Sequence, residues 1–252
     1  MKDTQLRLDD TEVKNPVLVE GLAGIGHIGK TTVAYLVEHL NAEEIGEIES
    51  SHFPPFTLID DDKHIELLTN TIYGLEREDG RDLVLVEGDA QASTNEGHYE
   101  VAETILDLAD EVDAHEIVTV GGYGTGDVVD EPDVFGAVTA DEMKEKFDGV
   151  SFDHEVGQIV GASGLVLGLG ENRGYGGVAL LGETPGFLLS DPSATEAVLQ
   201  SLEGAMNLDL DYDDLEDKVQ ESQDVLEKLQ NLKQQQQQGE KENQGGDLGY
   251  IG

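Results

Sequence analysis

The sequence predicts an α/β fold: a three-layer α/β/α core with a mostly parallel sheet, followed by a long C-terminal amphipathic helix and a flexible tail. Short apolar runs such as Leu83 to Glu87 (LVLVE) are typical of strands that are covered on both faces. These runs alternate along the chain with segments whose apolar residues recur at helical spacing. The final segment lacks such runs, and it changes to a heptad-like pattern and then to a glutamine run.

The elements can be placed in order from these patterns. Pro16 to Leu40 combines an apolar strand, a glycine-rich turn and a helix. Further strands are expected within Ile45 to Pro55, twice within Thr57 to Tyr73, and at Leu83 to Glu87, Ile117 to Val120 and Val178 to Leu181. Further helices are expected at Gly97 to Ala109, at Thr139 to Phe147 with Thr139 as N-cap, and at Ser193 to Met206 with Pro192 in the first turn.

Three segments are less regular. Asp127 to Phe135 is expected to be an acidic loop, and Gly170 to Gly177 a glycine-rich loop. Gln158 to Leu169 mixes apolar residues and glycines, so it is either a tightly packed helix or a strand followed by a turn.

Composition divides the chain into three parts. Residues 1–212 form the predicted core domain, and residues 213–233 an acidic helix with apolar residues at coiled-coil-like spacing. Residues 234–252 form a Gln- and Gly-rich tail, which we expect to be flexible and which ends in an apolar cluster around Tyr250. An apolar cluster at the end of a polar linker indicates a segment that binds a partner.

Acidic residues dominate the composition. The chain has 55 Asp and Glu against 14 Lys and Arg, and its net charge is -41. This charge excludes nucleic acid and anionic membranes as favoured partners, because the electrostatic contribution to binding would be repulsive. Apolar runs between the charges indicate a folded chain rather than a disordered one. We therefore expect a halophilic protein with an acidic surface, in a cytoplasm whose salt screens the repulsion.

Several classes of site are disfavoured by what the sequence lacks. It has no cysteine, which excludes disulfides and thiol catalysis. Its polar start has no signal-peptide pattern, and no apolar run reaches the ~20 residues of a membrane helix, so we expect a cytoplasmic location. The seven histidines show no metal-ligand spacing, and we expect neither a metal nor a cofactor.

One motif points to nucleotide chemistry. Gly24 to Thr31 (GIGHIGKT) matches the pattern GxxxxGK[ST], in which backbone N–H groups and Lys30 hold phosphates and Thr31 holds magnesium. Glu87 or Asp89 could then supply the acidic magnesium partner. Alternatively, Gly24 and Gly29 belong to a turn that is glycine-rich for packing, and Lys30 and Thr31 complete the pattern by chance.

Two further residues are candidates for chemistry. Arg173 suits a carboxylate or a phosphate, either as an anion ligand or in a salt bridge within the fold or across an interface. Ser163 lies in a sequence, Gly161-Ala-Ser163-Gly164, that is similar to a nucleophile elbow. However, Leu165 stands where the GxSxG motif requires its second glycine.

The order of the glycine-rich segments carries a family resemblance. GLAGIGHIGKTTVAYLVEHL, SSHFPPF, IVTVGGYGTG, IVGASGLVLGLG and ALLGETPGFLLSDPSATEAVL together resemble the archaeal branch of the proteasome assembly chaperone family, over roughly Pro16 to Leu215. The resemblance implies a nucleoside-phosphorylase-like α/β/α fold and a homo-oligomer, and our leading hypothesis is a non-enzymatic assembly chaperone. Its implied partners are α subunits of the proteasome core particle. The family has also been described as a candidate group of ATP-grasp-type enzymes, which keeps nucleotide binding as the alternative.

The resemblance also implies how such a partner is bound. Chaperones of this family use a C-terminal hydrophobic–Tyr–any-residue motif that enters pockets on the ring of α subunits. Here Ile251 occupies the penultimate position and Tyr250 precedes it, with Gly249 before the tyrosine. The expected partner-binding residues are therefore Leu248, Tyr250 and Ile251, and no catalytic residue is expected.

Overall fold

The structure, a computed structural model, describes residues 3–60, 62–154, 157–215 and 217–220. The chain divides into two compact units, Met1–Asp211 and Tyr212–Gly252. In the second unit, residues 213–215 and 217–220 are helical. The rest of the expected acidic helix lies outside the described residues. So does the 234–252 segment with Leu248, Tyr250 and Ile251.

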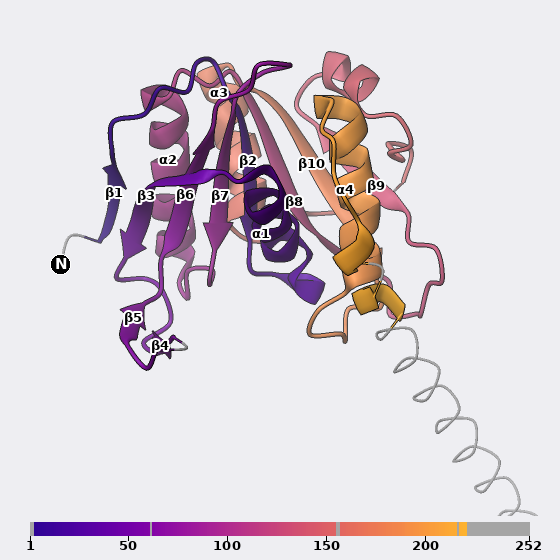
Figure 1. Cartoon of the computed structure of the whole chain (residues 1–252), viewed down its shortest axis with the longest axis horizontal. Coiled ribbons are helices and arrows are strands. Elements are labelled where there is room, and N and C mark those ends of the chain that lie inside the picture. Colours follow the sequence, from indigo (N-terminus) through magenta and orange to yellow (C-terminus); the bar gives the residue numbers. More distant parts are fainter. Residues whose placement is uncertain (1–2, 61, 155–156, 216, 221–252) are drawn as a thin grey trace, which may run out of the picture. The chain divides into compact units, whose positions relative to one another are not determined.

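The first unit is built on an eight-stranded mixed sheet of order β1-β3-β6-β7-β2-β8-β10-β9 (Figure 1). Its strands are β1 (Thr4–Leu8), β2 (Val17–Leu22), β3 (Glu43–Ser50), β6 (Asn70–Leu75), β7 (Leu83–Gly88), β8 (Glu116–Gly124), β9 (Val134–Val138) and β10 (Gly176–Thr184). The four central strands β7, β2, β8 and β10 run parallel. The outer strands pair antiparallel. The expected parallel sheet is therefore confined to the centre.

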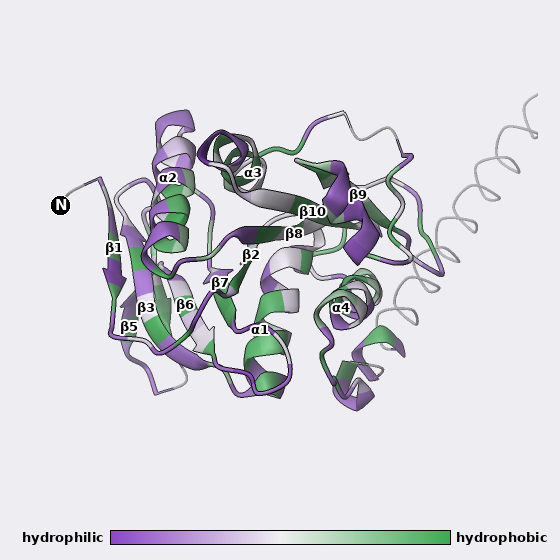
Figure 2. Ribbon diagram, turned by 90° about the horizontal axis from the view of Figure 1, so that it is seen from above, coloured by the Kyte–Doolittle hydropathy of each residue, from purple (hydrophilic) through white to green (hydrophobic). Residues whose placement is uncertain are grey.

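Two pairs of helices cover the two faces of this sheet (Figure 2). α1 (Ile28–Leu40) and α4 (Pro192–Met206) lie on one face, and α2 (Asn95–Glu111) and α3 (Ala162–Arg173) lie on the other. All six residues of β2 are buried, because helices pack on both sides of this strand. The apolar runs seen in the sequence are thus the centre of the core.

Local sequence signals account for the ends of two helices. Asp191 is the N-cap of α4 and accepts a hydrogen bond from the backbone N–H of Ala194 at 3.1 Å, while Pro192 occupies the first turn as expected. Thr94 caps α2 in the same way, through the backbone N–H of Gly97 at 3.0 Å. These caps replace hydrogen bonds that the first turn of a helix cannot make internally.

Several expected elements differ from the structure. Thr139 is not a helix cap: its hydroxyl instead accepts a hydrogen bond from the backbone N–H of Gly177 at 2.8 Å and helps to join β9 to β10. The short helix that follows is η2 (Asp141–Lys146), a 3₁₀ helix. The expected acidic loop ends in strand β9, which the sequence pattern did not indicate.

Two other regions also need correction. Gln158 to Leu169 contains the start of α3, and this helix continues to Arg173, so Arg173 ends a helix rather than lying in a loop. Thr57 to Tyr73 holds three strands instead of two. β4 (Thr57–Ile59) and β5 (Ile65–Leu67) form a separate hairpin, and β6 joins the main sheet.

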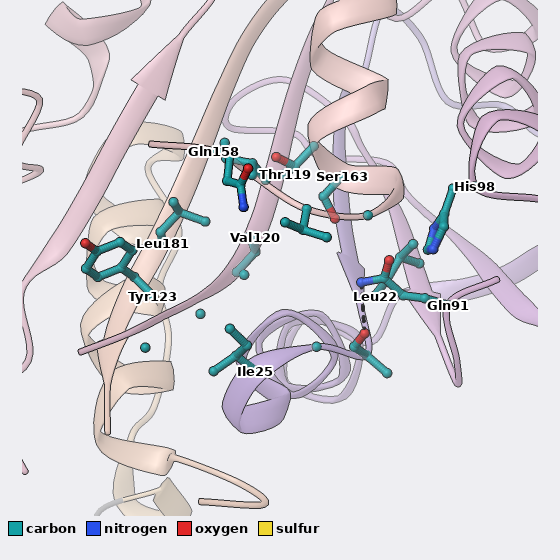
Figure 3. A pocket seen from close by; sticks show the side chains of 18 of the residues that line it. Leu22, Ile25, Gln91, His98, Thr119, Val120, Tyr123, Gln158, Ser163 and Leu181 are labelled. Atoms are coloured by element: carbon teal, nitrogen blue, oxygen red, sulfur yellow. Dashed lines mark hydrogen bonds between the residues drawn. The ribbon is translucent and has the colours of Figure 1, made fainter. Parts of the chain in front are cut away.

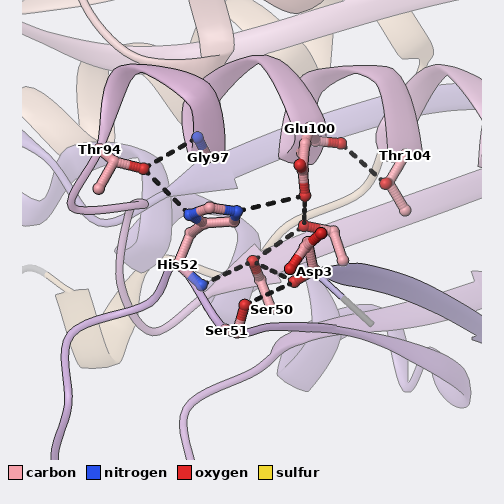
Figure 4. Close-up of polar contacts among 9 residues, drawn as sticks. Asp3, Ser50, Ser51, His52, Thr94, Gly97, Glu100 and Thr104 are labelled. Atoms are coloured by element: carbon pink, nitrogen blue, oxygen red, sulfur yellow. Dashed lines mark hydrogen bonds and ion pairs between the residues drawn. The ribbon is translucent and has the colours of Figure 1, made fainter. Parts of the chain in front are cut away.

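A polar cluster joins the edge of the sheet to α2 (Figure 4). The His52 ring lies between Thr94 and Glu100, with Nδ1 3.0 Å from the Thr94 hydroxyl and Nε2 3.4 Å from a Glu100 carboxylate oxygen. Thr4 on β1 donates to the same carboxylate at 2.9 Å and also contacts Ser50 on β3. The cluster therefore anchors β1 and β3 to the helix above them.

Glycines allow α1 to approach the sheet at backbone contact. A Cβ atom added at Gly21 would lie 2.1 Å from the carbonyl oxygen of Gly29, and one at Gly29 would lie 2.4 Å from that of Val120. Both distances are far below a van der Waals contact, so neither position has room for a side chain. This contact fixes the start of α1 against β2 and β8.

We expect Gly29→Ala to lower the free energy of unfolding by about 2 kcal/mol or more, because the added methyl overlaps backbone atoms that cannot move independently. The matched control is Gly204→Ala on α4, where an added Cβ meets nothing within 4 Å. That variant should gain about 0.5–1 kcal/mol from helix propensity. Urea titration of both variants checks the difference, and equal effects would contradict the packing argument.

Candidate functional site

A cavity of about 630 Å³ lies at the carboxyl ends of the parallel strands (Figure 3). β2 leads into α1 on one face of the sheet, whereas β7 leads into α2 on the other, and such a switch point is where open α/β sheets bind ligands. The cavity is lined by Leu22, Ala23, Gly24, Ile25, Gln91, Ala92, His98, Thr119, Val120, Gly121, Gly122, Tyr123, Gly124, Gln158, Ile159, Val160, Gly161, Ser163 and Leu181.

The cavity opens where two central strands part. β2 and β8 pair in register from Val17 with Glu116 to Glu20 with Thr119, and their pairing ends there. β8 continues beside β10 as far as Gly124, while β2 continues only beside β7. The carboxyl ends of β2 and β8 therefore diverge, and the space between them is part of the cavity.

A buried carboxylic acid lies at this divergence. Glu20 on β2 is fully buried, and its Oε1 accepts a hydrogen bond of 2.9 Å from the hydroxyl of Ser163, at the start of α3. Its other oxygen, Oε2, is buried and has no hydrogen-bond partner among the described residues. Burial raises the pKa of Glu20 to about 8, and the bond from Ser163 opposes this rise with a smaller effect. At neutral pH this side chain is mostly an uncharged acid.

Polar side chains around the cavity hold its walls together. The Gln91 amide donates to the carbonyl of Ala23 at 3.1 Å and accepts from the backbone N–H of Ala162 at 3.3 Å, so it joins the β2–α1 turn to the start of α3. The Nδ1 atom of His98 is buried and has no hydrogen-bond partner among the described residues. Within the described chain, the lining contains no lysine, arginine, aspartate or glutamate.

The structure separates the residues of the expected phosphate loop. Gly24 lines the cavity, whereas Gly29 packs against Val120 beneath α1. Lys30 and Thr31 lie in the first turns of α1, and the Lys30 ammonium is 2.9 Å from Asp89 Oδ1 and 3.8 Å from Glu87 Oε1. A phosphate at Lys30 would have to compete with this ion pair.

Arg173 lies at the opposite end of α3 from Ser163, about 15 Å along the helix axis at 1.5 Å per residue. Its guanidinium contacts three carboxylates of α2: Asp107 at 3.0 Å, Asp110 at 2.9 Å, and Glu103. The structure therefore places Arg173 in an ion-pair cluster between two helices and not at the cavity.

Sequence reasoning missed Glu20. The available signal was an acidic residue inside the apolar run VLVEG, at the end of a strand expected to be covered on both faces. A charged residue in such a position is seldom buried without a partner. Here that partner, Ser163, is 143 residues away in the sequence.

Other classes of site find little support in the described part of the chain. No group of three or more His, Cys, Asp or Glu residues there is arranged to hold a metal ion. No helix among the described residues combines the length and the apolar character needed to cross a membrane.

Comparison with known proteins shows the family. The model of the PAC2 family matches residues 18–230, and the chain belongs to this family. It is 33% identical over 229 residues to the uncharacterized protein MJ1210 of Methanocaldococcus jannaschii, covering 90% of this chain and 88% of the relative.

Solved structures agree with this assignment. Pyrococcus furiosus PbaB, described as an archaeal proteasome activator, is 36% identical with a TM-score of 0.85, covering 91% of this chain and all of PbaB. P. furiosus PbaA, described as an archaeal homolog of proteasome-assembly chaperone, has a TM-score of 0.75 at 24% identity, with 98% of this chain and all of PbaA covered. The likeness to PbaA shows the shared fold. The expected resemblance to the archaeal proteasome assembly chaperones is confirmed.

We expect Glu20→Gln to change how stability depends on pH. The folded state keeps the Glu20 proton up to pH about 8, whereas the unfolded chain releases it near the ordinary pKa of 4.5. The stabilising contribution of the protonated Glu20 side chain is therefore fully present below pH 4.5 and is lost as the pH rises through 8. The free energy of unfolding of the wild type, relative to the variant, should fall by up to about 1.4 kcal/mol per pH unit in between.

Denaturant titrations at several pH values and constant high salt check this expectation. Glutamine keeps an oxygen for the Ser163 hydroxyl, so the variant retains the buried hydrogen bond. Glu66→Gln, at an exposed position on β5, is the matched control and should leave the pH dependence unchanged. Parallel curves for the wild type and Glu20→Gln would show that Glu20 does not hold its proton in the folded state.

Proposed function

We propose that this protein is a homo-oligomeric, non-enzymatic, proteasome assembly chaperone-like protein that binds α subunits of the core particle through its C-terminal tail. The observation that carries the proposal is the 36% identity to PbaB, an archaeal proteasome activator, over the whole length of that protein. The match covers 91% of this chain at a higher identity than the match to PbaA, which shows the fold alone. It therefore supports a related role rather than a shared scaffold alone.

The tail supplies the chemistry that such binding requires. Leu248, Tyr250 and Ile251 are apolar or aromatic, and they follow a segment that is rich in glutamine and glycine. Tyrosine at an interface buries a large ring and keeps a hydroxyl for hydrogen bonding. We propose that this cluster enters an apolar pocket on the α subunit and that the preceding segment acts as a spacer.

Self-association is supported by the hairpin of β4 and β5. Its pairing places Ile59 opposite Ile65, and Leu67 lies on the same face because side chains alternate along a strand. These three side chains are 67%, 74% and 58% exposed, respectively. A two-stranded hairpin with an apolar face is poorly stable alone in water. We propose that a second copy of the chain covers this face, because in a two-fold dimer the same apolar face of each copy can pack against the other.

We expect deletion of residues 248–252 to weaken binding to archaeal proteasome α subunits by at least about 30-fold, as for the loss of a hot-spot anchor. Tyr250→Ala should cause most of this loss if the tyrosine is the anchor. Gln236→Ala, in the glutamine run, is the control that keeps the tail length and should bind normally. Binding is measured in high salt by surface plasmon resonance, and undiminished binding by the truncated protein would overturn the tail assignment.

We expect Ile65→Asp to shift the protein to a smaller oligomer, because a charge in a buried apolar contact has no compensating partner. Lys63→Asp is the control: it lies in the same hairpin and changes charge outside the apolar face. Light scattering coupled to gel filtration gives the mass of each variant. An unchanged mass for Ile65→Asp would show that the apolar face of the hairpin is not the self-association surface.

A further inference from the structure

The proposed binding through the tail assigns no role to the cavity between β2 and β8. Its volume of about 630 Å³ lies within the range of small-molecule sites, roughly 300–1,000 Å³. Most of its lining is apolar or glycine, with a few polar side chains that converge from different elements. This composition is typical of sites that bind small organic molecules.

The charges around the cavity restrict the kind of molecule. Among the described residues, its lining carries no Lys, Arg, Asp or Glu, so neither an anion nor a cation finds a fixed countercharge. The carboxyl group of Glu20 lies directly beneath Ser163 and is mostly protonated at neutral pH.

Several polar atoms in and beside the cavity could form hydrogen bonds with an uncharged molecule. The Ser163 hydroxyl gives its hydrogen to Glu20, so its oxygen is left as an acceptor that faces the cavity. Thr119, from the last residue pair between β2 and β8, lines the same space. Two further polar atoms in this region are buried and have no hydrogen-bond partner among the described residues: Oε2 of Glu20 and Nδ1 of His98.

We propose that this cavity is a binding site for a small uncharged molecule, with an apolar body and an amide or hydroxyl group that hydrogen-bonds at Ser163 and Thr119. Glu20 acts as a positioning residue: it fixes the Ser163 hydroxyl by accepting its hydrogen. The apolar body lies against Leu22, Val120 and Leu181. The site binds independently of the tail, so it provides a second specificity in addition to the proposed partner.

The test uses the full-length protein and matched probes that are uncharged, negatively charged or positively charged. Benzamide, nicotinamide and benzyl alcohol are uncharged, benzoate and nicotinate are anions, and benzamidine is a cation. Binding is followed at pH 6.5 in high salt through the backbone amide NMR signals of Gly121 and Ser163. We expect at least one uncharged probe to shift these signals in a saturable way, and its charged counterparts to bind at least about tenfold more weakly.

A blocking variant tests the location. A Cβ atom at Gly121 would meet only Leu181, at 3.4 Å, so Gly121→Leu fills the cavity without displacing backbone. The control is Gly168→Leu on the exposed side of α3, where a Cβ meets nothing within 4 Å. Gly121→Leu should abolish probe binding, the control should retain it, and both should bind α subunits as the wild type does.

Other outcomes would overturn the proposal. If no uncharged probe binds at Gly121 and Ser163, or if charged probes bind equally well, the site is not selective for neutral molecules. If Gly121→Leu folds and still binds the probe, the cavity is not the site. Should that variant fail to fold, Ser163→Ala and Thr119→Val remove the two proposed hydrogen-bonding groups, and unchanged affinity in both would equally contradict the assignment.

Discussion

The approach of α1 to the sheet at backbone contact is the constraint on which the rest of the first unit depends. Gly21 and Gly29 face each other across a gap that admits no Cβ atom, and Gly29 also lies against the carbonyl of Val120. Because α1 is held this closely, the turn that precedes it must lie against the carboxyl ends of the central strands. That turn supplies Gly24 and Ile25 to the cavity wall.

The same constraint explains the opening beside it. A third contact, between Gly122 and the carbonyl of Ile25, holds the turn against β8 beyond the point where β2 and β8 stop pairing. The two strands diverge beyond Glu20 and Thr119, which are their last pair. The close packing of the turn and the opening of the cavity beside it are therefore linked. A side chain at Gly29 or Gly122 would move the turn, and it would alter both the packing of α1 and the shape of the cavity.

Much of this fold follows from the sequence, and the exceptions have physical causes. The central strands and α2 and α4 were predictable because their apolar periodicity and caps are local signals. α3 was ambiguous because Gly164, Gly168 and Gly170 lower its helix propensity and dilute its apolar stripe. Strand β9 was missed since it is short and follows an acidic, proline-containing segment. At the site, the glycines were visible in the sequence, but the Glu20–Ser163 pair depends on tertiary structure.

The few cations of this acidic chain show how its recognition must work. All four arginines lie in the described residues, and each is engaged within the fold: Arg7, Arg81 and Arg173 pair with carboxylates, and Arg77 donates to backbone carbonyls. Lys30 pairs with Asp89 at the end of β7. These groups hold elements together and have little capacity left to bind an anion. Exposed charge attraction is also weak in high salt. Recognition by apolar contact and neutral hydrogen bonds is therefore favoured, both for the proposed tail and for the uncharged cavity.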